Sequence, residues 1–87
     1  MEFDWDENKN QKNIMKHKID FADAIHVFID DDRIERIDSR KNHHEERWQT
    51  FGLTQFGILV VIYTERNDDN TIRLISARQA NKKEKKL

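Results

Sequence analysis

The chain has 87 residues, of which 36% are hydrophobic and 38% are charged. This length allows one small domain, residues 1–87, whose hydrophobic core must be thin. Cysteine is absent, which excludes disulfides, thiolate metal sites and cysteine catalysis. The longest apolar run, residues 58–63, is too short to cross a bilayer, and the acidic first residues do not resemble a signal peptide. We therefore expect a cytoplasmic domain without a membrane segment.

The net charge of −1 conceals an asymmetry along the chain. Residues 1–46 hold 8 Lys/Arg and 13 Asp/Glu, which sum to −5. Residues 47–87 hold 8 Lys/Arg and 4 Asp/Glu, which sum to +4. A basic half indicates an anionic partner and an acidic half a basic one, although a solvated surface with a basic tail explains the same charges.

The first segment of the chain predicts a short strand and then a polar helix. Phe3 and Trp5 alternate with acidic residues, which is the period of a half-buried strand. Asp6 can cap the helix that follows, because a carboxylate accepts hydrogen bonds from the free N–H groups of a helix N-terminus. The apolar side chains of this helix are mainly Ile14 and Met15, so we expect it to lie on the surface.

A second helix is predicted after Asp20, which is another favourable N-cap. Its apolar residues recur at the i, i+3, i+4 and i+7 positions of one helical face: Phe21, Ala24, Ile25 and Phe28. Three carboxylates at residues 30–32 oppose the helix dipole and end the helix there. We expect this helix to lie in the core.

Strand patterns dominate the second half of the chain. A short edge strand is predicted around Ile34 and Ile37, and longer strands over residues 47–53, 58–65 and 71–78. Residues 38–46 are predicted to form an exposed loop, and Gly57 and residues 67–70 to form turns. Residues 81–84 have the spacing of a capping box at the start of a last short helix.

The predicted fold class is therefore α+β, with a strand, two helices, three or four strands and a short helix. A small antiparallel sheet with the helices packed on one face is the economical arrangement. The other face of the sheet is then partly bare, and a ligand could dock there.

Several motifs keep a characteristic order and spacing over nearly the whole chain: Phe3-Asp4-Trp5-Asp6, Lys16-His17 with Ile19 and Phe21, Glu46-Arg47-Trp48, Gly52, residues 60–66 and Ile75-Ser76-Ala77-Arg78. Together they resemble the BrnT toxin family. The resemblance implies a RelE-like fold and the toxin half of a bacterial type II toxin–antitoxin module. It also implies metal-independent RNA cleavage without a cofactor. The implied partner is BrnA, a ribbon-helix-helix antitoxin, through which alone the toxin would reach DNA.

The sequence departs from the family pattern at three places. Lys18 stands where the family usually has Gly, which suits a left-handed helix end. Either the backbone avoids that conformation or it is strained there. Gln49 stands where the family is usually apolar, and residues 33–45 match nothing in the family pattern.

RNA cleavage without a metal needs a base, cations that stabilise the phosphorane and an acid. The catalytic candidates are His17, Glu65, Arg66 and Arg78, and the substrate-binding candidates are Lys16, Arg47, Trp48 and Ser76. His17 could act as base or acid because an unperturbed histidine has a pKa of ~6.5, although it could instead only stabilise the end of its helix. Trp48 could stack an unpaired base, although it could equally belong to the core.

Three arginines end or begin strands of the predicted meander: Arg47, Arg66 and Arg78. From adjacent strands they could converge on one phosphate, although each could instead form a surface ion pair with a carboxylate such as Glu65. Strict strand alternation places Ser76 on the face of Arg78 and Arg73 on the opposite face.

No metal site is predicted, because the adjacent His43 and His44 lack further residues at convincing ligand spacing. We expect a metal-independent endoribonuclease toxin that inhibits growth by cleaving RNA and is neutralised by a ribbon-helix-helix antitoxin. The alternative is a non-catalytic binding subunit that forms an autorepressing, DNA-bound complex with its antitoxin.

Overall fold

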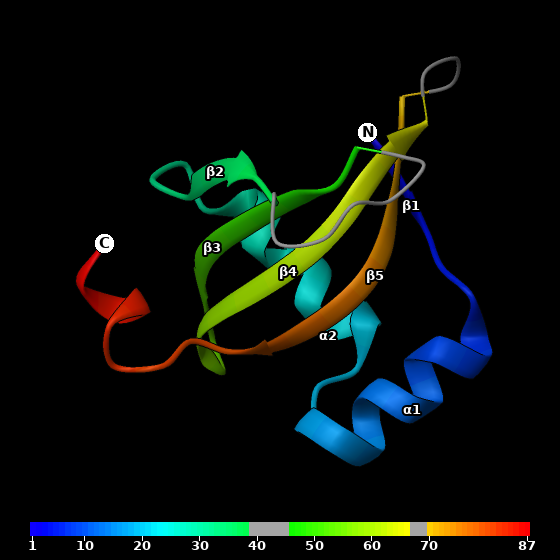
Figure 1. Cartoon of the computed structure of the whole chain (residues 1–87), viewed down its shortest axis with the longest axis horizontal. Coiled ribbons are helices and arrows are strands. Elements are labelled where there is room, and N and C mark those ends of the chain that lie inside the picture. Colours follow the sequence, from blue (N-terminus) through cyan, green and yellow to red (C-terminus); the bar gives the residue numbers. More distant parts are fainter. Residues whose placement is uncertain (39–45, 67–69) are drawn as a thin grey trace.

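The computed structural model describes residues 1–38, 46–66 and 70–87 (Figure 1). The elements in chain order are β1 (Glu2–Asp4), α1 (Glu7–His17), α2 (Phe21–Ala24), the 3₁₀ turn η1 (Ile25–Ile29), β2 (Ile34–Ile37), β3 (Trp48–Thr54), β4 (Gly57–Arg66), β5 (Thr71–Gln79) and the 3₁₀ turn η2 (Glu84–Lys86). The predicted histidine pair at 43–44 and most of the predicted turn at 67–70 lie outside the described residues.

The strands form one sheet in the order β1-β5-β4-β3-β2. The last four strands form the predicted antiparallel meander, but β1 runs parallel to β5. The helices carry the chain from β1 at one edge of the sheet to β2 at the other, and the meander then brings β5 back alongside β1 in the same direction. The α+β fold class is confirmed, with a sheet that is mixed rather than wholly antiparallel.

The main core lies between one face of the sheet and the segment formed by α2 and η1. Its buried side chains are Ile19, Phe21, Ala24, Val27, Phe28, Leu59, Val61, Tyr63, Ile72, Leu74 and Ala77. The predicted second helix is thus in the core, but it changes to a 3₁₀ turn after residue 24 and so also buries Val27. Gly52 allows the close approach of this turn, because a Cβ atom there would lie 2.8 Å from the Cβ atom of Val27.

Helix α1 packs against β5 through polar side chains rather than apolar ones. Met15 is exposed and Ile14 is half-buried, whereas Asn10 and Asn13 are buried. The Asn13 amide nitrogen donates to the carbonyls of Ala77 (2.8 Å) and Ile19 (2.9 Å), and its oxygen accepts from the Ala77 N–H (3.1 Å). Asn13 therefore completes the edge of β5 beyond the end of β1. The helix lies on the surface as expected, but buried asparagines, rather than Ile14 and Met15, attach it.

A β-bulge in β5 changes which side chains share a face. Ser76 lies opposite Ile62 and Leu74 lies opposite Tyr63, so Ile75 is the extra residue. Since a bulge shifts the alternation by one residue, Arg73 returns to the same face as Ser76 and Arg78. The prediction that Arg73 lies opposite Arg78 is wrong for this reason.

The face of the sheet opposite the helices, called here the helix-free face, is not bare at its centre. Val60, Ile62 and Thr64 of β4 all lie on it and are buried. Phe51 and Ala80 pack against Val60 in a second small core. The chain after β5 thus returns over the centre of this face and leaves its margins, such as Ile34 and Leu53, exposed, so the face is only partly bare.

The predicted helix caps are present at all three positions. Asp6 accepts from the N–H of Asn8 (2.8 Å), and Asp20 accepts from the N–H of Ala22 (2.9 Å). In the capping box at 81–84, the N–H of Asn81 donates to the Glu84 carboxylate and the N–H of Glu84 donates to the Asn81 side-chain oxygen, both at 2.9 Å. The box begins only one 3₁₀ turn. Lys18 adopts the left-handed conformation, with φ of 63° and ψ of 26°, so its backbone carries the strain that a glycine would avoid.

Candidate active site

Two rows of paired residues cross the helix-free face from β2 to β5. The first row is Arg36, Gln49, Ile62 and Ser76, and the second is Ile34, Phe51, Val60 and Arg78. Directly paired residues of antiparallel strands point to the same face. An arginine therefore stands at the β2 end of one row and another at the β5 end of the next.

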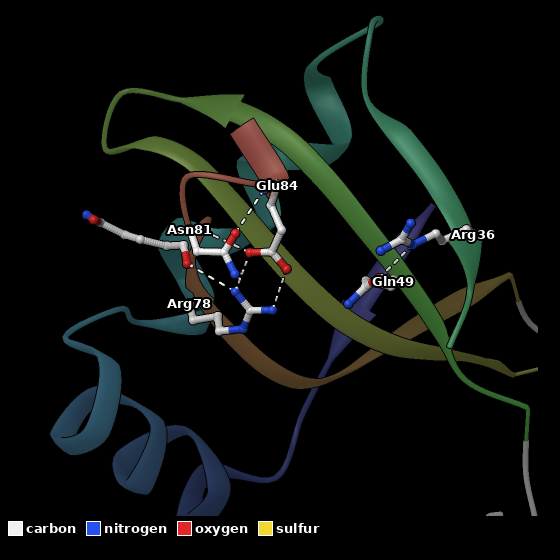
Figure 2. A network of polar contacts seen from close by, with 6 residues as sticks. Arg36, Gln49, Arg78, Asn81 and Glu84 are labelled. Atoms are coloured by element: carbon white, nitrogen blue, oxygen red, sulfur yellow. Dashed lines mark hydrogen bonds and ion pairs between the residues drawn. The ribbon is translucent and has the colours of Figure 1, made fainter. Parts of the chain in front are cut away.

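Arg78 is held by a carboxylate from the chain that follows its own strand. Its two terminal nitrogens donate to the two oxygens of Glu84 at 2.7 and 2.8 Å (Figure 2). This bidentate pair, with a hydrogen bond from the Asn81 backbone N–H, lowers the pKa of Glu84 from 4.5 to about 2. Both side chains are mostly buried, so the fork of Arg78 grips a two-oxygen anion in a sheltered position.

Arg36 is a site residue that the sequence did not reveal. Its Nε donates to the Oε1 of Gln49 at 2.9 Å, and its guanidinium carbon lies 4.9 Å from the centre of the Phe51 ring. Figure 2 shows this pair over the same face as Arg78 and Glu84. No family motif covers residues 33–45, so the family pattern could not point to Arg36. The sequence signal that could have indicated Arg36 is its partner Gln49, a polar residue at a position that is usually apolar in the family.

His17 ends α1 beside β5, within the electrostatic reach of Arg78. Burial first, then the positive charges of Lys16 and Arg78, lower the pKa of His17 below its ordinary value of 6.5. The imidazole is therefore predominantly neutral at pH 7 and has a lone pair that can accept a proton. Asn13 sets this position, because it lies one helical turn earlier and fixes α1 to β5.

The three arginines predicted to share a phosphate do not meet. Arg66 lies six residues beyond Val60, the partner of Arg78, which separates the two by about 20 Å along the sheet. Arg66 and Arg73 instead pair with Asp4 of β1, at 4.0 and 3.2 Å.

Other predicted site residues are spread over the molecule. Arg47 directly precedes β3, whose first residue, Trp48, faces the helices and packs half-buried against the main core. This packing agrees with the alternative that Trp48 belongs to the core, and stacking of an RNA base by Trp48 stays a prediction. Glu65 is exposed opposite Ile72, and Lys16 is exposed in the last turn of α1. Of the predicted site residues, Ser76 and Arg78 share the helix-free face, and His17 lies close enough to Arg78 for that charge to act on its imidazole.

Several apolar side chains of the described residues are exposed, and Ile34, Leu53 and Leu87 among them line a shallow depression together with Glu84. Ile29, Ile34, Leu53, Phe56 and Leu87 are all exposed. A shallow pocket of about 410 Å³ is lined by Ile29 and Leu53, with His26 and Asp30. Within residues 1–38, 46–66 and 70–87, no three His, Asp or Glu side chains form a group that could hold a metal ion. No helix in these ranges is long and apolar enough to span a membrane.

The comparison with known families agrees with the fold and with the motifs. A family profile described as the ribonuclease toxin BrnT of a type II toxin–antitoxin system matches residues 5–84. No curated protein matches the sequence. Since the family match spans almost all of the 87 residues, this chain belongs to the BrnT family of ribonuclease toxins.

Proposed function

We propose that the chain is a metal-independent endoribonuclease whose active site lies around Arg78 and His17. The observation that carries this proposal is the bidentate grip of Arg78 on the Glu84 carboxylate, 2.7 and 2.8 Å, beside a histidine whose pKa is lowered. A phosphate offers a guanidinium fork the same pair of oxygens as a carboxylate. The RNA phosphate would replace Glu84 on this fork.

The proposed reaction uses the RNA's own 2′-hydroxyl as nucleophile. His17 accepts the proton of this hydroxyl as the bond from the 2′-oxygen to phosphorus forms. The bond from phosphorus to the 5′-oxygen breaks, and this oxygen takes a proton from solvent. Arg78 stabilises the negative charge that develops on the phosphorane, and Ser76, on the same face, donates to a phosphate oxygen. The products are a 2′,3′-cyclic phosphate and a free 5′-hydroxyl.

Cleavage of labelled single-stranded RNA in the presence of EDTA tests the proposal. We expect activity to persist and the 3′ ends to be cyclic phosphates. His17→Gln and Arg78→Gln should each lower the rate by roughly a hundredfold or more, as for the loss of one group that stabilises a transition state. Lys12→Gln is the control for Arg78→Gln, because it removes one positive charge from an exposed position on α1.

Activity that EDTA abolishes and Mg²⁺ restores would contradict the mechanism. If the folded protein leaves RNA intact but still binds its antitoxin, the non-catalytic, autorepressing subunit becomes the better description.

The partner proposed from the family is a ribbon-helix-helix antitoxin of the BrnA type, acting with the toxin in the cytoplasm. The toxin would contact DNA only through this partner. The exposed apolar residues Ile29, Ile34 and Leu53 are suitable contacts for it, because buried apolar area stabilises complexes. Co-expression should give a complex that melts above the free toxin by an amount that rises with antitoxin concentration. If the co-expressed complex and the free toxin melted at the same temperature, the proposed partner would be contradicted.

A further inference from the structure

Arg36 occupies an unusual position for a surface arginine, because three of its contacts are fixed by the sheet. Its backbone pairs with Gln49, its Nε donates to the Gln49 side chain at 2.9 Å, and its guanidinium lies over Phe51. Gln49 is itself buried, with 5% of its surface exposed. A buried polar side chain needs a partner, and here that partner is the guanidinium of Arg36.

The terminal nitrogens of Arg36 remain available. Within residues 1–38, 46–66 and 70–87 they have no hydrogen-bond partner. A guanidinium that is held at Nε and stacked on a ring has already lost most of its side-chain freedom, so binding an anion costs less entropy. Arg36 is thus prepared for an oxyanion that none of the described residues places on its terminal nitrogens.

Arg36 and Arg78 approach the same part of the helix-free face. Phe51, beneath Arg36, pairs with Val60, and Val60 pairs with Arg78. Phe51 and Arg78 are therefore two strands apart, about 10 Å. The charge of Arg36 also helps to lower the pKa of Glu84, the carboxyl group that Arg78 holds. The two cations face one shared region, as neighbouring phosphates of one nucleic acid strand require.

We propose that Arg36 binds a non-scissile phosphate of the RNA, next to the scissile phosphate on Arg78, and that Gln49 is the positioning residue for Arg36. This inference rests on the proposed ribonuclease function. It also explains the departure at position 49: a polar side chain is needed there because residue 36 is an arginine that must lie flat on the sheet.

The test combines RNA binding with cleavage kinetics for Arg36→Gln, Gln49→Leu and the control Lys12→Gln. Binding of a fluorescein-labelled single-stranded RNA is measured by anisotropy over a series of KCl concentrations. For Arg36→Gln we expect affinity to fall roughly tenfold. The negative slope of the logarithm of the binding constant against the logarithm of the salt concentration should become shallower by about 0.7, the value for one phosphate of a single strand. KM should rise with little change in kcat, because a non-scissile contact binds ground and transition states alike.

Gln49→Leu keeps the charge and restores an apolar side chain, so the domain should stay folded while KM rises severalfold. A purely structural role of Gln49 would change the melting temperature and leave KM unchanged. A salt slope for Arg36→Gln equal to that of Lys12→Gln would overturn the proposal. If the wild-type protein binds RNA without cleaving it and the slope still changes, the ribonuclease proposal fails while the phosphate site of Arg36 stands.

Discussion

Replacing Asn13 by alanine should destabilise the protein more than any exposed substitution on α1. The side chain is buried, with 7% of its surface exposed, and makes three hydrogen bonds of 2.8 to 3.1 Å. Two of them complete the edge of β5 at Ala77, where β1 has already ended. Alanine would leave an N–H and two carbonyls without partners beneath a helix.

The expected magnitude follows from these three bonds. Each buried hydrogen bond lost costs about 1–1.5 kcal/mol, which gives about 4 kcal/mol in total. The better helix propensity of alanine returns about 0.6 kcal/mol, so the free energy of unfolding should fall by about 3 kcal/mol. For a domain of this size that corresponds to a melting temperature lower by roughly 12–24 °C.

Urea and thermal denaturation followed by circular dichroism measure this loss. Asn8→Ala is the matched control, because Asn8 lies on the same helix and is exposed, and it should change stability by less than about 0.5 kcal/mol. Asn13→Asp keeps one acceptor but loses both donated bonds, and its instability should lessen as acid protonates the new carboxyl group. A loss below about 1 kcal/mol for Asn13→Ala would refute the view that asparagines dock α1.

Lys18→Gly should raise the free energy of unfolding by about 0.5–1 kcal/mol in urea titrations, because glycine adopts the φ of 63° without steric cost; an equal or lower value would show that Lys18 is unstrained. Glu84→Gln should lower the melting temperature at pH 7. The difference should shrink as pH falls from 4.5 toward 2, because the carboxyl group of the unfolded chain binds a proton in that window while the native one, with its pKa lowered to about 2, still resists protonation. A constant difference would contradict the ion pair. The NMR titration of His17 should have its midpoint below pH 6.5. Arg78→Gln should raise this midpoint, because it removes a positive charge that disfavours protonation of the imidazole. An unchanged midpoint would show that Arg78 does not act on His17.

The sequence predicted the strands well because their apolar patterns are local. The meander of β3, β4 and β5 matched to within one residue at most ends, and the caps at Asp6 and Asp20 formed as expected. These features depend on residues close together in the chain, so periodicity and side-chain type are sufficient to find them.

The errors all concern contacts between distant residues. The bulge at Ile75 reverses the face of Arg73, and the adjacent apolar residues Leu74 and Ile75 are its trace in the alternation. Asn13 has the composition of a surface helix residue, yet it hydrogen-bonds to a strand 64 positions away. Arg36 enters the site only because β2 pairs with β3. Family motifs located Arg78 and His17, but only the register showed that Arg66 lies too far from them.

The parallel pair of β1 and β5 has a consequence for the protein while it is being synthesised. Asp4 meets Arg73 across 69 positions, and closing a loop of that length costs about 4 kcal/mol of chain entropy. A strand of three residues offers little to offset this, so it pairs after the meander has formed. On the ribosome, β1 and α1 must wait until β5 has emerged. His17 of α1 and Arg78 of β5 are 61 positions apart, so the nascent polypeptide cannot bring the two proposed site residues together until β5 has been synthesised.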